Sequence, residues 1–244
     1  MKGWITRIHL WTGLLLGLQV LVWMSSGVVM SWFAIEQVRG EHNIAVNAEK
    51  SLNTITPYLD PARLMGQPGA KGARSVTLRY LLDKPVYEVE TTDGHRLFDA
   101  LTGARLDPLP EEMARAIAGR DFTGRGEIVS ADLLTDRTTE YRASVPVWRL
   151  RFADGEHTRI YVSPVTGAVV ARRNAVWRLY DFFWMLHIMD YDERTDFNNP
   201  LIKTASATGL IFALSGLALV LFRLGAGRYM IDLRRLFRIR RRQR

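Results

Sequence analysis

Two histidines stand out among the residues of this 244-residue chain that could bind a cofactor or a metal ion. His9 lies in an apolar segment, where an ionisable side chain is costly and usually has a partner. Gly13 and Gly17 follow at spacings of four and eight, which places all three residues on one face of a helix. His187 lies in the aromatic-rich segment 176–189. Because imidazole is a common axial ligand of haem iron, one interpretation is a flat porphyrin lying against the glycines, with histidine as its ligand.

A second interpretation stays open for each of these histidines. Small residues let two helices approach closely, so Gly13 and Gly17 could serve packing, with His9 reaching the membrane surface. A similar small face recurs in the second apolar segment, at Ala205, Gly209, Ala213 and Gly216. His187 could contact lipid headgroups from an amphipathic helix whose aromatic residues lie in the membrane interface. The other histidines, which we expect to be solvated, are His42, His95 and His157.

Two uncharged segments predict the helices that must position these residues. Residues 8–35 and 204–222 contain no Asp, Glu, Lys or Arg. At about 1.5 Å per residue the first reaches roughly 42 Å and the second roughly 28 Å, against a hydrocarbon core of about 30 Å. Both are predicted to span a membrane. The first is longer than the apolar part of a signal peptide and lacks small residues at a cleavage site, so we interpret it as an uncleaved anchor.

The formal net charge of +8 is divided unevenly by these two segments. The residues before the first carry +2, residues 36–200 carry −3, and residues 201–244 carry +9. Basic residues concentrate on the cytoplasmic side of membrane proteins, so both termini are predicted to be cytoplasmic and residues 36–200 to lie outside. The Arg-rich tail is interpreted as a topology signal that contacts anionic lipid, and as an interfacial helix, with no role in binding nucleic acid.

The region between the two spans contains an internal repeat. The segments 87–94 (YEVETTDG) and 148–155 (WRLRFADG) both alternate as strands and end in Asp-Gly, a hairpin-turn signal. A second strand and a Thr-Gly turn follow each of them. Helices are predicted upstream at 52–65 and 111–118, and further strands at 76–82 and 143–147. The pattern predicts two consecutive α+β modules.

The order of these elements resembles a known family. Helix, strand, Asp-Gly hairpin and Thr-Gly turn are similar to the PepSY module, here present twice. The segment RIHLWTGLLLG at 7–17 resembles the opening of the PepSY-associated membrane-helix family, and WMLHIMDYDERTDFNNPL at 184–201 resembles its compact two-span members. The resemblance implies an inner-membrane protein with periplasmic domains. Larger relatives with four membrane helices include b-haem reductases of iron–siderophore complexes, which carry more membrane histidines than this chain.

Geometry limits how one chain could hold haem. With both termini inside, His9 lies near the inner surface and His187 near the outer one, separated by about the 30 Å of the hydrocarbon core. One haem cannot use both. A symmetric dimer could hold one haem near each surface, through paired His9 and paired His187 residues. The sequence contains no dinucleotide-binding motif, so electrons would come from another protein or from quinol.

Other kinds of site find less support. The acidic cluster at 190–196 does not fit an EF-hand, because Arg194 stands at the fifth position and no glycine follows it. A weak cation site or a solvated loop are the two interpretations. The chain has no cysteine, so disulfides and thiolate sites are excluded. No hydrolase motif is present.

The sequence therefore predicts an α+β membrane protein in which two transmembrane helices flank two tandem PepSY-like modules and an interfacial helix. The predicted segments are a cytoplasmic N-terminus (1–7), a first span (8–35), two periplasmic modules (36–108 and 109–174), an interfacial helix with an acidic loop (175–200), a second span (201–223) and a basic cytoplasmic tail (224–244).

The leading hypothesis is an accessory or b-haem-bearing electron-transfer component in periplasmic iron or siderophore reduction, with His9, His187, Gly13 and Gly17 at the cofactor. The alternative is a non-catalytic module that inhibits, regulates or scaffolds a periplasmic partner or a membrane complex. The expected partners are the lipid bilayer, a redox or periplasmic protein, and a second copy of the chain.

Overall fold

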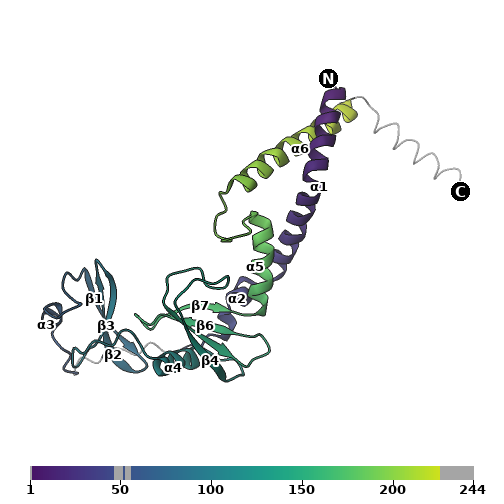
Figure 1. The fold of residues 1–244 in the computed structure, drawn as a ribbon. Coiled ribbons are helices and arrows are strands. Elements are labelled where there is room, and N and C mark those ends of the chain that lie inside the picture. Colours follow the sequence, from purple (N-terminus) through teal and green to yellow (C-terminus); the bar gives the residue numbers. More distant parts are fainter. Residues whose placement is uncertain (1, 47–51, 53–55, 226–244) are drawn as a thin grey trace. The chain divides into compact units, whose positions relative to one another are not determined.

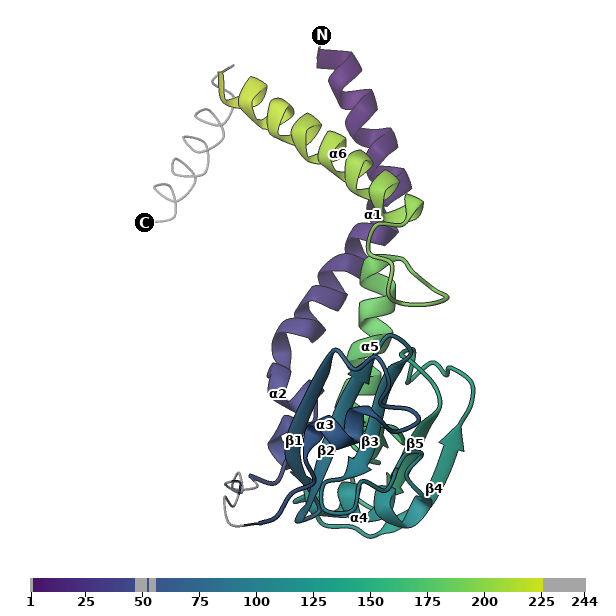
Figure 2. The same ribbon diagram turned by 90° about the vertical axis from the view of Figure 1, so that its left-hand side faces the viewer.

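The structure, a computed structural model, describes residues 2–46, 52 and 56–225 and divides the chain into two compact units. Residues 1–32 and 181–244 form one, here called the helical unit, and residues 33–180 form the other, the sheet unit. Figures 1 and 2 show the elements of each unit. The predicted basic tail and its interfacial helix lie almost wholly outside the described residues.

Two long helices dominate the helical unit, and both are long and apolar enough to cross a membrane. They are α1 (Lys2–Trp32) and α6 (Pro200–Gly225). Helix α6 begins at a proline, which has no N–H to leave unpaired, and the side chain of Asn199 caps the helix by accepting the N–H of Ile202 at 3.0 Å. The two predicted spans are confirmed as helices, although α1 begins earlier than predicted and ends at Trp32.

The first sheet of the sheet unit is an antiparallel meander of three strands. It consists of β1 (Ser75–Leu81), β2 (Lys84–Thr91) and β3 (Gly94–Asp99), in the order β1-β2-β3. The predicted Asp-Gly turn joins β2 to β3, and Gly94 takes a φ of 111°, which a residue with a side chain rarely adopts.

The helix predicted over 52–65 is too long. Residues 53–55 lie outside the described residues, and the helix found is α3 (Pro61–Met65). Proline is favoured at the first helical position and Asp60 caps it, its side chain accepting the N–H of Ala62 at 2.8 Å, so the helix begins there.

The second sheet has four antiparallel strands in the order β4-β5-β6-β7, with helix α4 (Glu111–Asp121) against it. The strands are β4 (Ile128–Leu134), β5 (Val147–Phe152), β6 (Arg159–Val162) and β7 (Val169–Arg173). The strand predicted at 143–147 is wrong, because the chain is a loop there and β5 begins at Val147. Strand β5 lies between β4 and β6, and β4 is a strand that the sequence analysis did not predict.

One hydrophobic core joins the two repeats. Leu150 and Ile160 of the second sheet, and Ile117 of α4, belong to the same buried cluster as Val86 and Leu97 of the first sheet. Two hydrogen bonds reinforce this junction: the Nε1 of Trp148 donates to the oxygen of Leu109 at 2.9 Å, and the N–H of Leu109 donates to the oxygen of Pro164 at 2.6 Å. The repeated modules are therefore packed as one body within the sheet unit.

Short helices lead into and out of this body. They are α2 (Ile35–Val38), a 3-10 turn at Glu41–Asn43, and α5 (Ala175–Ile188). The side chain of Asn174, buried, caps α5 by accepting the N–H of Trp177 at 2.7 Å and donates to the oxygen of Gln37 at 2.8 Å. The aromatic helix predicted at 176–189 is confirmed as α5, and its place in a membrane interface stays a prediction. Residues 175–180 of α5 belong to the sheet unit and residues 181–188 to the helical unit.

Candidate functional site

His187 is fixed against α1 by a chain of hydrogen bonds at the end of α5. Its Nδ1 lies 2.8 Å from the Oγ of Ser26, and that hydroxyl donates to the oxygen of Trp23 at 2.9 Å. The Nε1 of Trp23 in turn donates to the backbone oxygen of His187 at 2.9 Å. The tautomer that fits this arrangement donates Nδ1–H to Ser26, since the serine proton is then directed to the Trp23 carbonyl. In that tautomer the lone pair is on Nε2, the nitrogen left to bind a ligand.

A groove lies beside this histidine, formed by α1, α5 and α6. Its volume is about 600 Å³, and its lining is mostly apolar with two serines and the imidazole as polar groups: Trp23, Met24, Gly27, Val28, Ser31, His187, Ile202 and Ser206. A side chain built on Gly27 would meet nothing within 4 Å, so the wall of the groove is open there. A groove with apolar walls and a few polar groups is typical of sites for small molecules and cofactors.

His9 occupies a closer-packed place between α1 and α6. Its Nδ1 lies 3.0 Å from the Oγ of Ser215 and 3.2 Å from the oxygen of Phe212, and its ring stacks on Phe212 with 4.4 Å between the centroids and 6° between the planes. Ser215 donates to the oxygen of Phe212 at 2.7 Å, so the Nδ1 of His9 also carries the proton. A Cβ at Gly216 would lie 2.9 Å from the Cε1 of His9, so the ring fits only because this residue is glycine.

The predicted glycine face divides into a packed part and an open part. A Cβ at Gly13 would lie 2.8 Å from the Cε2 of Phe212, so this glycine accommodates the phenyl ring of α6. A Cβ at Gly17 would meet nothing within 4 Å. The direct contact between Gly13 and Phe212 thus supports the interpretation as a helix-packing surface. A flat ligand could lie against Gly13 only if Phe212 moved.

The structure does not bring His9 and His187 together. His187 contacts α1 at Ser26, which is 17 residues from His9, or about 26 Å along the helix. The separation is close to the 30 Å expected from the sequence. Each site therefore has one imidazole from this chain.

The acidic cluster folds on itself as a loop. Asp190 accepts the backbone N–H groups of Glu193, Thr195 and Asp196 at 3.2, 2.8 and 2.9 Å. Burial raises the pKa of Asp190, but backbone hydrogen bonds, including those from Asp196 and Thr195, outweigh burial and lower the pKa below its ordinary value. Within the described ranges, no three His, Asp or Glu residues are placed to hold a metal ion.

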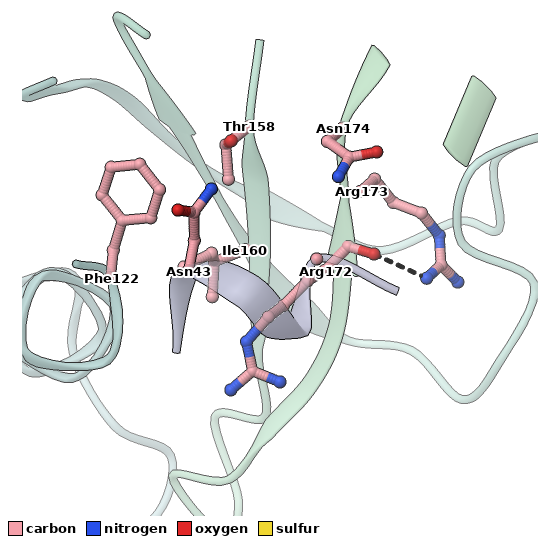
Figure 3. Close-up of a pocket in the computed structure, with 8 residues that line it drawn as sticks. Asn43, Phe122, Thr158, Ile160, Arg172, Arg173 and Asn174 are labelled. Atoms are coloured by element: carbon pink, nitrogen blue, oxygen red, sulfur yellow. Dashed lines mark hydrogen bonds between the residues drawn. The ribbon is translucent and has the colours of Figure 1, made fainter. Parts of the chain in front are cut away.

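A smaller cavity lies in the sheet unit, between the turn at 41–43, α4 and β7 (Figure 3). Its volume is about 10 Å³, which is room for about one water molecule. Two of its polar residues are already engaged, since Arg172 pairs with Asp121 and Asn174 bonds Gln37. Of the solvated histidines, His42 and His95 pair with Glu156 and Glu88 at 3.1 Å, and His157 is exposed. We assign no function to this cavity.

The residues that orient the two histidines were not predicted. Ser26, Ser215 and Phe212 act through contacts between helices, and a serine in an apolar span gives no signal by its type alone. Gly216 had been singled out only as part of a small face.

A comparison with family profiles matches residues 6–244 to the PepSY-associated TM region. The chain belongs to this family. It is a membrane protein in which two transmembrane helices flank two antiparallel sheets and their helices, as the resemblance at the two ends of the chain predicted. Neither the curated proteins nor the solved structures compared with it gave a match.

Proposed function

We propose that this PepSY-associated membrane protein is an electron-transfer component whose groove would hold a haem b, with the Nε2 of His187 as a ligand of its iron. The observation that carries the proposal is the imidazole beside the groove, held through Nδ1 by Ser26 at 2.8 Å. A metal-bound histidine typically donates its other ring N–H to a fixed acceptor, which orients the ring and makes the ligand nitrogen more basic.

The residues of the groove fit such a group better than those around His9. The groove has open space beside His187 and no side chain at Gly27, whereas Phe212 already covers one face of His9 and the surface of Gly13. A ligand at His9 would require Phe212 to move. A second histidine at this cofactor would come from a second copy of the chain or from a membrane partner, because His9 is about 26 Å away.

The chain's own groups have defined roles in this proposal. Ser26 and Trp23 fix the orientation of His187, and Met24, Val28 and Ile202 give the groove apolar walls. Haem b supplies one-electron transfer when bound, at a potential set by its ligands and by burial. We propose that the reaction served is the reduction of iron or of iron–siderophore complexes in the periplasm.

The test is optical. We expect the full-length protein, purified in detergent with haem supplied during expression, to show a reduced-minus-oxidised band near 560 nm, as b-type haem does. His187→Ala should remove the band. Ser26→Ala should keep it but shift the midpoint potential or weaken haem retention, as loss of a ligand's supporting hydrogen bond does.

The matched control is His42→Ala, since His42 lies in the sheet unit and pairs with Glu156. This variant should keep the full band. A colourless wild-type protein, or a band that survives His187→Ala, would refute the haem site. A colourless protein would instead favour the alternative, a non-catalytic module acting on a periplasmic partner.

We also propose that the protein lies in a bacterial inner membrane with both termini in the cytoplasm. The support is the charge of +9 over residues 201–244 and +2 before the first span. When it is fused after Arg244, a reporter that works only in the cytoplasm should be active. Activity of a periplasmic reporter at the same place would reverse the orientation.

A further inference from the structure

The groove beside His187 contains a second side chain of a type that binds haem iron. The amino acids that serve as axial ligands of haem are histidine, methionine, cysteine and tyrosine. Among the described residues that line the groove, two belong to these types, His187 and Met24. The two serines of the lining do not, and the hydroxyl of Ser31 already donates to the backbone oxygen of Val28 at 3.0 Å. Met24 is therefore the residue of the groove to consider as a further ligand.

Met24 is not used in the packing between the helices. It is 67% exposed, whereas Leu16 and Ser26 of the same helix are buried. The methionine side chain is unbranched and has three rotatable bonds, so its sulfur can take several positions over the neighbouring turn of the helix. The thioether of Met24 can therefore turn toward a group in the groove without breaking a contact that holds α1 in place.

Gly27 separates Met24 from the bound edge of His187 around helix α1. Successive residues of a helix are about 100° apart, so Met24 lies about 60° from Gly27 on one side and Ser26 lies about 100° from it on the other. Ser26 is the residue whose Oγ lies 2.8 Å from the Nδ1 of His187. A Cβ at Gly27 would meet nothing within 4 Å, so a flat group can lie against the helix there. Such a group has the imidazole on one side and the thioether on the other, which is what two axial ligands require.

We propose, on the basis of the haem site proposed above, that Met24 is the second axial ligand opposite His187, so that one chain supplies both. The other histidine of the helical unit, His9, is about 26 Å away along α1 and cannot serve. Methionine with histidine gives haem a higher reduction potential than two histidines do. The site therefore accepts an electron more readily than a site with two histidines would.

The experiment compares the wild type with Met24→Leu, both full-length, in detergent and with haem supplied during expression. Ferric haem with a methionine ligand has a weak absorption band at long wavelength that haem with two histidine ligands lacks. The wild type should show this band and bind one haem per chain. Met24→Leu should lose the long-wavelength band but keep the reduced-minus-oxidised band, because His187 remains and leucine has nearly the volume of methionine.

A second variant separates the loss of the sulfur from the loss of a ligand. Met24→His should also lose the long-wavelength band, but it should stay six-coordinate and have a lower midpoint potential than the wild type. Met24→Leu should leave one coordination position open, so its reduced form should bind carbon monoxide faster than the wild type and Met24→His do. The matched control is Met30→Leu, which changes another methionine of α1 that is not among the residues lining the groove. This control should keep the spectrum and the potential of the wild type.

Two results would overturn the role of Met24 and leave the haem site at His187 in place. The first is a wild type that binds one haem per two chains and has no long-wavelength band, since a second copy would then supply the other ligand. The second is a long-wavelength band that survives Met24→Leu or that Met30→Leu removes. A wild type that binds no haem would overturn the proposed function and the role of Met24 together.

Discussion

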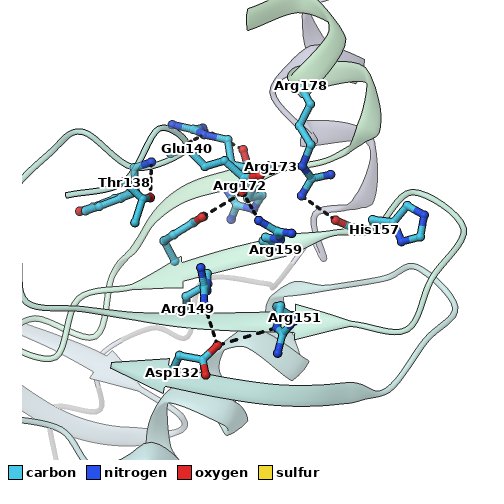
Figure 4. Close-up of polar contacts among 12 residues, drawn as sticks. Asp132, Thr138, Glu140, Arg149, Arg151, His157, Arg159, Arg172, Arg173 and Arg178 are labelled. Carbon is cyan, nitrogen blue, oxygen red and sulfur yellow. Dashed lines mark hydrogen bonds and ion pairs between the residues drawn. The ribbon is translucent and has the colours of Figure 1, made fainter. Parts of the chain in front are cut away.

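Replacing Glu140 by Gln removes a carboxylate that pairs with two arginines of the sheet unit, Arg159 on β6 and Arg178 on α5 (Figure 4). The Glu140 carboxylate lies 2.7 Å from Arg159 and 2.8 Å from Arg178, accepts the hydroxyl of Tyr161 at 3.2 Å, and is 16% exposed. Its backbone oxygen also accepts the Nε of Arg173 at 2.9 Å. Hydrogen bonds to a charged group contribute about 1.5–3 kcal/mol, and glutamine can keep one of them, so we expect a loss of about 2 kcal/mol in unfolding free energy.

The effect of this substitution depends on pH in a defined direction. Burial raises the pKa of Glu140, but its pairs with Arg178 and Arg159 outweigh burial and hold the pKa below the ordinary 4.5. A carboxyl whose pKa is lowered by folding contributes stability above its unfolded pKa and loses it as pH falls through the folded value. The difference between wild type and Glu140→Gln should therefore be full above about pH 5 and fade below pH 4.5. Burial and Glu140 raise the pKa of Tyr161 to about 12, so this tyrosine stays neutral throughout.

The assay is thermal unfolding of the full-length chain in detergent, followed by near-ultraviolet circular dichroism at pH 7 and pH 3.5. For a body of this size about 2 kcal/mol corresponds to a fall of roughly 4–8 °C in Tm. The control is Glu127→Gln, an exposed glutamate of the same unit, for which we expect a change below about 1 °C. A fall in Tm that is equal at both pH values would refute the electrostatic reasoning.

Three further outcomes follow from the packing. Leu150→Ala should destabilise the sheet unit by about 2–5 kcal/mol and lower the temperature of a single unfolding transition, because Leu150 lies in the core shared by both sheets. Two separate unfolding transitions would contradict the shared core. Trp148→Phe removes the donor to the oxygen of Leu109 and should lower the free energy of unfolding by about 1–2 kcal/mol in the same experiment. An unchanged free energy of unfolding would mean that water replaces the lost donor at that carbonyl. Gly216→Val should displace the ring of His9, because a Cβ there would lie 2.9 Å from Cε1. Disulfide crosslinking between cysteines placed on α1 and α6 should then be slower than in the control Gly3→Val, where a Cβ meets nothing within 4 Å. An unchanged crosslinking rate would contradict the packing.

The sequence alone determined the elements whose signals are local. Uncharged segments at 8–35 and 204–222 predicted the two spans, since crossing a bilayer needs only length and apolarity. The Asp-Gly pairs predicted the hairpins, and at the first of them Gly94 takes the positive φ that such a turn requires. The false strand at 143–147 and the unpredicted β4 show the limit, since whether a short segment forms a strand depends on the strand that it pairs with, which for β4 is β5.

Only the tertiary structure decided which residues meet. Leu150 shares a core with Leu97, and Ser26 meets His187, across 53 and 161 positions of sequence. The repeat predicted two modules, and packing made them one body, because each sheet has an apolar face that must be buried against another element. The sequence predicted that His9 and His187 lie at different depths of the membrane. In the structure His9 packs against Phe212 and His187 lies beside an open groove. Only the tertiary structure shows this difference, because side-chain packing depends on distant residues that no local pattern specifies.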